Sequence, residues 1–246
     1  MALKASPEAQ ASLLQLQASD NRLQQLDHKA RMLPEAELVA GLTKESEGLR
    51  QQLLAETGAI EDARLELGRV ESDVAVVEAR IVRDTDRVAS SASVKDVAGL
   101  EHELESLRRR RDDLEEIQLG VMERLDELES IAAITRERYE ELAASIAAAE
   151  AERDASLGAI TAERTAAAAN RVAIAGGLPD DLLALYERQR GRYGQGASHL
   201  RFGVSAASGV KLNENDMAAI RSAAPDDVVL CPDSQAILVR TDESGL

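Results

Sequence analysis

Apolar residues recur at alternating spacings of three and four along most of the first 175 residues. One series of Leu, Ala, Val and Ile runs through 16–81, and a second runs through 97–174. Such a heptad pattern is typical of α-helices that coil around one another. The pattern stops at about 85–95, where Ser, Ala and Val predominate. Two helices of similar length joined by a short break predict an antiparallel helical hairpin over 6–176.

Two prolines mark expected helix boundaries. Ser6 has the side chain of a helix N-cap, and Pro7 suits the first helical position. Pro34 lies inside the heptad pattern, where it lacks a backbone donor and disfavours helical geometry at Leu33. We therefore expect a kink or a short break near Pro34.

The distribution of large and small side chains favours pairing of the two helices within one chain. If the turn lies near residue 90, the numbers of facing residues sum to about 182. The alanine-rich stretch 143–169 then faces the leucine-rich stretch 13–38, so that small side chains meet large ones. A parallel homodimer would instead set alanine against alanine. The hairpin is the better solution.

A second, smaller domain is predicted at 177–246, after two glycines and a proline end the heptad pattern. Turn residues and short apolar runs predict a mixed α and β region. Its expected elements are a short helix at 180–190, strands at 197–204, 209–212, 228–230 and 236–240, and a short helix that Asn213 caps and that ends before Pro225. The last residues, 241–246, are expected to be frayed.

Composition supports a rod rather than a globule. Aromatic residues make up 2% of the chain, which fits a thin interface between helices better than a three-dimensional core. The net charge of −16 disfavours non-specific binding to DNA or to an anionic membrane surface. One cysteine, no signal-peptide pattern and no long uncharged apolar stretch predict a cytoplasmic protein without a membrane partner.

Two segments near the C-terminus, 178–188 and 237–240, resemble a bacterial family in which a long helical hairpin is joined to a four-cysteine zinc ribbon. The resemblance implies a mainly α fold with a zinc-ribbon-like domain. It also implies four metal-ligand positions, namely Ser205, Ser208, Cys231 and Ser234. Three of the four are serine, and neutral hydroxyls are poor ligands for structural zinc. We therefore expect a degenerate site with no bound zinc and no other cofactor.

No catalytic constellation is recognisable in the sequence. The three histidines are widely separated, and there is no nucleophile–base motif, ligand cluster or glycine-rich phosphate loop. The expectation is a non-enzymatic adaptor or scaffold, either a monomer or a weak homodimer, in which the hairpin presents the ribbon-like region to a protein partner. The resemblance points the same way, since members of that family are connected with flagellar or secretion-system assembly.

The alternative is binding of RNA or DNA by a cluster of basic and aromatic residues in the C-terminal region. The resemblance allows this too, because one branch of the family is linked to RNA handling. The candidate contacts are Arg188, Arg190, Arg192, Tyr193, His199 and Arg201. A competing interpretation is that these arginines form ion pairs with Glu187 and with acidic residues of the hairpin.

Overall fold

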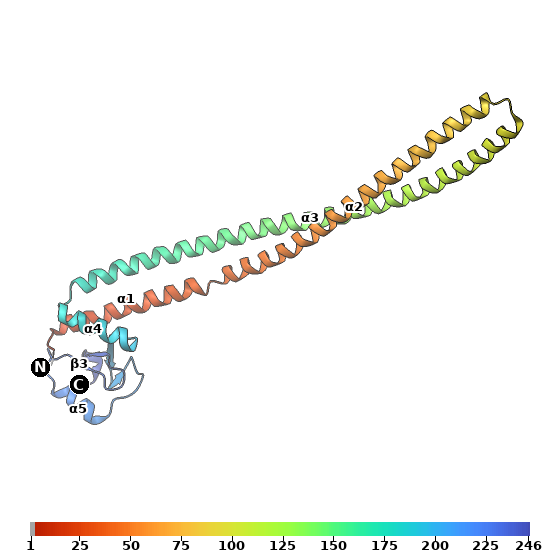
Figure 1. Ribbon diagram of the computed structural model, residues 1–246. Helices are drawn as coiled ribbons and strands as arrows, with labels where there is room; N and C mark the ends of the chain where they lie inside the picture. The colour runs from red at the N-terminus through yellow and green to blue at the C-terminus, as the bar shows by residue number, and fades with distance from the viewer. Residues whose placement is uncertain (1–2) are drawn as a thin grey trace. The chain divides into compact units, whose positions relative to one another are not determined.

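The protein is described by a computed structural model that covers residues 3–246 and divides into two compact units (Figure 1). One unit contains the chain up to Pro34 together with Glu152–Leu246, and the other contains Glu35–Ala151. The predicted class is confirmed: the chain is mainly α, with a long antiparallel helical hairpin and a small strand-containing C-terminal region. The domain ranges 6–176 and 177–246 stay a prediction.

Three long helices account for the heptad pattern. Helix α1 spans Pro7–Arg31, α2 spans Pro34–Ser90 and α3 spans Val94–Gly176. The N-terminus of α1 is capped as expected, because the Ser6 hydroxyl accepts a hydrogen bond from the N–H of Ala9 at 3.2 Å. Non-helical backbone at 32–33 separates α1 from α2, directly before the proline, which confirms the predicted break.

In the unit formed by Glu35–Ala151, α2 and the first part of α3 pack antiparallel through their heptad positions. Buried residues include Ile60, Ala63 and Val70 on α2 and Leu104, Leu114 and Val121 on α3. Ion pairs flank this apolar contact, among them Arg64–Glu129 at 2.5 Å and Arg80–Glu103. These exposed pairs contribute less to stability than the buried apolar side chains.

The alignment of α2 and α3 differs from the expectation that the numbers of facing residues sum to about 182. Facing residue numbers sum to 183 for Arg80 and Glu103, but to 193 for Arg64 and Glu129. The rule assumed a symmetric turn and a constant stagger between the helices, and the stagger instead changes along the hairpin. Leu38 was also expected to be in the interface, yet it is 50% exposed, because the heptad phase restarts when α2 begins.

In the other unit, α1 packs against the last part of α3. Their shared apolar cluster contains Leu26, Leu33 and Ile160, together with partly buried Ala30 and Ala167. Large side chains therefore occur on both helices, and the expected division of leucine against alanine holds only in part. The exposed ion pair between Asp27 and Arg164, at 2.7 Å, lies beside this contact.

The C-terminal region of the same unit begins with α4 and contains a four-stranded sheet. Its order is β2-β1-β4-β3; the central pair, β1 and β4, is parallel and the outer pairs are antiparallel. The elements are α4 (Asp180–Tyr193), β1 (Ala197–Arg201), β2 (Val204–Ser205), α5 (Glu214–Ser222), β3 (Val229–Leu230), β4 (Ile237–Val239) and the 3₁₀-helix η1 (Asp242–Ser244).

Each face of the sheet packs on a different apolar cluster. Side chains alternate along a strand, so Ile237 and Val239 of β4 lie in one cluster and Leu238 lies in the other. The first cluster includes Leu13 and Leu16 of α1, which means that the sheet packs on the base of the hairpin. The second cluster lies between the sheet and α5. The C-terminal region is thus held on both faces.

Three features of this region differ from expectation or were not anticipated. Residues 209–212 form no strand and make only a single bridge, between Val204 and Lys211. The terminal residues 241–246 were expected to be frayed, but η1 forms there and the fully buried Ser244 hydroxyl donates to the carbonyl of Leu200 at 2.9 Å. Finally, Leu3 near the N-terminus accepts a hydrogen bond from the N–H of residue 228 at 3.0 Å.

Candidate functional site

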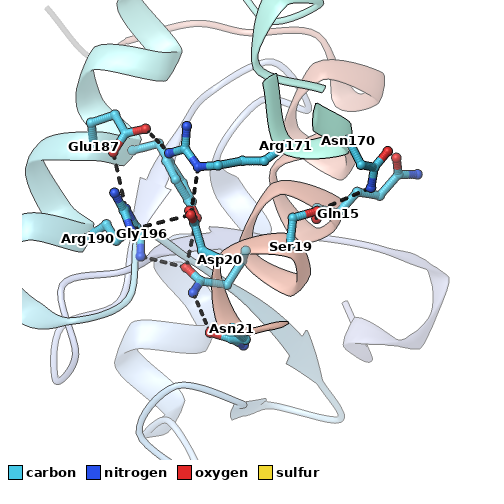
Figure 2. Close-up of polar contacts among 11 residues, drawn as sticks. Gln15, Ser19, Asp20, Asn21, Asn170, Arg171, Glu187, Arg190 and Gly196 are labelled. Carbon is cyan, nitrogen blue, oxygen red and sulfur yellow. Dashed lines mark hydrogen bonds and ion pairs between the residues drawn. The ribbon is translucent and has the colours of Figure 1, made fainter. Parts of the chain in front are cut away.

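A group of buried and half-buried polar side chains lies where α1, the end of α3, α4 and the start of β1 meet (Figure 2). We refer to this group as the polar junction; its members are Gln17, Asp20, Arg171, Tyr186, Glu187 and Arg190. The residues come from segments up to 173 positions apart, and all lie in one compact unit. Buried polar groups on this scale occur where they are fully paired, because each unpaired one is costly.

Asp20 is the centre of the polar junction. Its side chain is 3% exposed, and its carboxylate accepts hydrogen bonds from the Tyr186 hydroxyl at 2.6 Å and from Nε of Arg171 at 2.7 Å. The guanidinium of Arg190 lies 3.4 Å away. Two arginines and one phenol therefore compensate a carboxylate that has almost no access to water.

The two arginines of the polar junction are also bridged by a second carboxylate. Glu187 pairs with Arg171 and, at 3.2 Å, with Nε of Arg190. The hydrogen bond to Asp20 is the main reason that the pKa of Arg171 lies above its usual value; partial burial acts in the opposite direction. The cluster thus has two positive and two negative charges, all within reach of one another.

Gln17 extends the polar junction to the backbone of the sheet. Its side-chain oxygen accepts hydrogen bonds from the N–H of Gly196 at 2.8 Å and of Ala197 at 3.2 Å. Its amide nitrogen donates to Asn21 at 2.9 Å. Gly196 lies directly against Tyr186, where a Cβ atom would be 2.5 Å from the ring. The start of β1 is therefore tied to α1 by hydrogen bonds and by close packing.

Burial is the main reason that the pKa of Tyr186 lies well above its ordinary value of 10.0, and the hydrogen bond to Asp20 adds to the effect. The folded state therefore keeps this phenol protonated where the unfolded chain ionises it. The associated stability is fully present below about pH 10 and is lost as the pH rises further. We expect the free energy of unfolding to fall by up to about 1.4 kcal/mol per pH unit above pH 10.

Urea unfolding at a series of alkaline pH values, in wild type and in Tyr186→Phe, measures this effect. The phenylalanine variant should lose the Tyr186 contribution to the alkaline slope, whereas Tyr193→Phe, at an exposed tyrosine, serves as the control. An unchanged slope in Tyr186→Phe would show that another group causes the alkaline loss.

Chemically, the polar junction joins structural elements and offers no reactive centre. Its donors and acceptors are used by one another, and none of its members is a nucleophile paired with a base. Among residues 3–246, no group of three or more His, Cys, Asp or Glu side chains is arranged to hold a metal ion. Across the same described part of the chain, no helix has the length and apolarity needed to cross a bilayer.

Three of the six predicted nucleic-acid contacts form hydrogen bonds or ion pairs within the chain. Arg190 belongs to the polar junction. Arg201 forms an exposed ion pair with Glu243 at 2.7 Å, and Nε2 of His199 lies 2.9 Å from the hydroxyl of Thr241. For Arg190 the structure contains the competing arrangement, in which the guanidinium pairs with Glu187 and with Asp20 of the hairpin.

The other three predicted contacts lie along α4. Arg188 is exposed and lines a shallow groove of about 510 Å³ beside β3. Arg192 is exposed and lies over the ring of Tyr193, with 5.4 Å from the guanidinium carbon to the ring centroid. Of the six residues, Arg190 alone belongs to the polar junction, whereas Arg188, Arg192, Tyr193 and Arg201 are exposed. Their binding to nucleic acid stays a prediction.

The four degenerate ligand positions lie in two loops of the C-terminal region. Ser205 and Cys231 are fully buried, whereas Ser208 and Ser234 are half-buried. The N–H of Ser234 donates to the sulfur of Cys231 at 3.5 Å. Three hydroxyls and one thiol do not make the soft donor set that structural zinc requires, so these residues do not fit the metal.

An exposed turn between β1 and β2 is a second candidate site. Phe202, the one phenylalanine of the sequence, is 75% exposed and has a φ of 47°, and the next residue, Gly203, has a φ of 74°. Their backbone N–H groups donate to the carbonyls of Glu243 at 2.9 Å and Ser244 at 3.3 Å. We call residues 201–204 the Phe202 turn. This turn interrupts the single strand that was predicted at 197–204.

Sequence reasoning missed the polar junction, although one signal was available. Between Leu16 and Leu23 the alternating spacing of three and four falls on a polar residue, Ser19, and the next residue in the chain is Asp20. A polar residue at an interface position of a coiled coil often has a specific buried partner. The partners of Asp20, however, lie more than 150 residues away along the chain.

Comparison with known proteins identifies similar chains over nearly the whole length. Residues 16–194 match the model of the CT398-like coiled coil hairpin domain. An uncharacterized protein of Mycobacterium tuberculosis is 34% identical over 241 residues, which is 98% of each chain. None of these names states an enzymatic activity.

Two solved structures show the same fold. A structure from Mycobacterium smegmatis has a TM-score of 0.88 at 35% identity and covers 97% of this chain and 100% of its own. CT398 from Chlamydia trachomatis has a TM-score of 0.66 at 17% identity, covering 94% of this chain and 97% of its own. At that identity the second likeness is one of fold alone.

Proposed function

Because the chain belongs to the CT398-like coiled-coil hairpin family, we propose that it is a non-enzymatic cytoplasmic adaptor. In this proposal the hairpin supports the C-terminal region, and the Phe202 turn is the element that a protein partner recognises. The observation that carries the proposal is the exposure of Phe202 in a left-handed backbone conformation.

The Phe202 turn is unfavourable for local structure. Positive φ values at both central residues are the pattern of a type I′ turn, in which asparagine, aspartate and glycine are preferred. A bulky residue in that conformation costs on the order of 1 kcal/mol or more. Because Phe202 is 75% exposed, packing returns little of this cost. A residue that breaks a local rule without a gain in stability is the kind expected at a functional site.

The charges near the Phe202 turn favour a protein partner over a nucleic acid. Arg201 is already paired with Glu243, and a second acidic residue, Asp242, directly precedes Glu243 in the chain. The whole chain has a net charge of −16, which opposes a phosphate backbone. An exposed aromatic ring on a short, hydrogen-bonded turn is suited to an apolar pocket on a partner, where such anchors dominate the binding energy.

The polar junction supports the same role. It fixes the sheet to the base of the hairpin within one unit, and the hydrogen bonds to the buried Asp20 carboxylate resist local opening. A recognition turn on a rigid support loses less conformational entropy on binding than one on a mobile loop. The lack of a reactive group at this junction is in keeping with a role in positioning.

Phe202→Asn tests the proposal because asparagine suits the turn while removing the ring. Affinity purification from the source cytoplasm with cross-linking would identify a partner, and calorimetry with the purified partner would measure its Kd. We expect Phe202→Asn to raise that Kd by about thirtyfold or more, as for a residue that contributes about 2 kcal/mol or more. The stability of the variant should stay equal or rise, because the strain of the turn is relieved.

Val82→Asn is the matched control, since Val82 is 60% exposed on α2 in the other unit. Equal Kd values for wild type and Phe202→Asn would contradict the proposal. Recovery of RNA or DNA instead, with an affinity that falls steeply with salt and disappears when Arg188 and Arg192 are changed to Glu, would favour the nucleic-acid alternative.

A further inference from the structure

Two loops of the C-terminal region, 205–210 and 231–236, have the same backbone hydrogen bonds. In both, the N–H of the first residue donates to the carbonyl of the sixth, at 3.2 Å from Ser205 and 2.8 Å from Cys231. The N–H of the fifth residue donates to the carbonyl of the first, at 2.8 Å in the loop of Ser205 and 2.9 Å in that of Cys231. We call these segments the two knuckle loops.

The similarity of the knuckle loops extends to the fourth and fifth residues. The fifth residue is left-handed in both, with a φ of 68° at Gly209 and 59° at Gln235. The fourth residue is serine in both, and its hydroxyl accepts a hydrogen bond from the N–H of the sixth, at 3.2 Å for Ser208 and 3.4 Å for Ser234. A left-handed glutamine is uncommon, so the shared geometry is not merely a consequence of glycine content.

The first residues of the two knuckle loops meet in the interior. Ser205 and Cys231 are both fully buried, and the Ser205 hydroxyl lies 3.4 Å from that of Ser198. The Cys231 sulfur accepts the N–H of Ser234 at 3.5 Å. The Ser205 hydroxyl is a further hydrogen-bond partner of the same sulfur. The thiol is therefore the centre of a hydrogen-bonded group.

Positions one and four of a knuckle loop have the spacing of a Cys-x-x-Cys metal-binding loop. Two such loops facing each other supply the four ligands of a tetrahedral zinc site. In this chain those positions hold three hydroxyls and one thiol, a set that does not fit zinc. The backbone is thus that of a zinc-binding site, whereas the side chains at the ligand positions are not zinc ligands.

We propose that the two knuckle loops are the backbone of a zinc site in which a hydrogen-bonded serine–cysteine cluster stands in place of the metal. The chain as it is folds without zinc. Cysteine at Ser205, Ser208 and Ser234 is sufficient to make a four-thiolate site, because the loops already hold the required conformation. The apolar cluster beneath them, between the sheet and α5, supplies the stability that zinc supplies in a metal-dependent fold.

The test is the triple variant S205C/S208C/S234C, purified under reducing conditions next to wild type. Elemental analysis should give about one zinc per chain for the variant and none for wild type, as a four-thiolate site binds one ion. Cobalt should give the visible absorption of a tetrahedral thiolate complex with the variant only. A chelator should lower the Tm of the zinc-loaded variant and leave that of wild type unchanged.

A quadruple variant that adds C231S to the triple variant is the matched control, since it removes one thiolate and should bind cobalt at least tenfold more weakly. The double variant S208C/S234C changes only half-buried positions and is used if the triple variant does not fold; with Cys231 it should still bind cobalt through three thiolates. Stoichiometric zinc in wild type would overturn the proposal. So would a folded triple or double variant that binds neither metal.

Discussion

Replacing Asp20 with alanine is expected to lower the free energy of unfolding of its unit by about 3–5 kcal/mol. The carboxylate is 3% exposed and pairs with Arg171 at 2.7 Å and with the Tyr186 hydroxyl at 2.6 Å. Without it, the buried Tyr186 phenol keeps only a hydrogen bond of 3.3 Å to Gln17, and the half-buried Arg171 guanidinium keeps only Glu187. Hydrogen exchange of the fully buried amides of β4 reports the opening directly, since these residues lie at the centre of the sheet.

Asp27→Ala is the matched control for this prediction. Asp27 also lies on α1 and also pairs with an arginine of α3, Arg164, at 2.7 Å, but its side chain is 47% exposed. An exposed pair of this kind contributes about 0–1 kcal/mol. If the two alanine variants were equally stable, burial would not be the reason for the importance of Asp20. Added salt should weaken only the Asp27 pair.

Replacing Gly196 with alanine is expected to lower the free energy of unfolding of the same unit by about 3 kcal/mol. An added Cβ would lie 2.5 Å from the ring of Tyr186 and 2.7 Å from its carbonyl oxygen. The carbonyl belongs to helix α4 and cannot retreat without breaking helical hydrogen bonds. Movement of β1 would instead break the 2.8 Å hydrogen bond from Gly196 to Gln17.

Gly191→Ala serves as the matched glycine control. Gly191 lies in α4, and an added Cβ there meets no atom within 4 Å. Alanine in a helix is more favourable than glycine by about 0.5–1 kcal/mol, so this variant should be more stable than wild type. Urea unfolding followed by circular dichroism compares the two. A Gly196 variant with wild-type stability would mean that the backbone of β1 can move away from α4.

The Asp20→Ala and Gly196→Ala variants also distinguish the role of the polar junction, which supports the sheet, from that of the Phe202 turn, which is proposed to contact the partner. Both weaken the attachment of the sheet to α1 and leave Phe202 in place, whereas Phe202→Asn removes the ring and leaves the attachment intact. If the adaptor proposal is right, partner binding should fall in both cases. Faster hydrogen exchange in β4 should accompany the loss of binding in Asp20→Ala and Gly196→Ala, but not in Phe202→Asn.

Local sequence patterns were sufficient for the helices. The interruption before Pro34 and the cap at Ser6 follow from the chemistry of those residues and their immediate neighbours. Patterns were less successful where the phase of a helix was decided by its partner. Val39, which is 9% exposed, is buried in place of Leu38. The reason is that the heptad phase of α2 begins anew after the break and that α3 is shifted along α2.

Interactions between distant segments could not be predicted from local patterns. Asp20 had the appearance of an ordinary polar residue of α1, and only the folded chain brings Tyr186 to it from 166 positions away. Arg190 was a candidate nucleic-acid contact by its place in a basic stretch, yet in the structure it lies 3.4 Å from the Asp20 carboxylate. Clustering of charge in sequence does not reveal which charges are already paired.

By itself the sequence determined the helical hairpin, its interruption at Pro34 and the change of character after Gly176, because each depends on periodicity or on the backbone chemistry of single residues. Tertiary structure alone decided which carboxylate is buried, which arginines face solvent and that the two knuckle loops, which begin at Ser205 and Cys231, share one backbone geometry. Those features depend on contacts between residues far apart in the chain, and such contacts form only when packing brings the segments together.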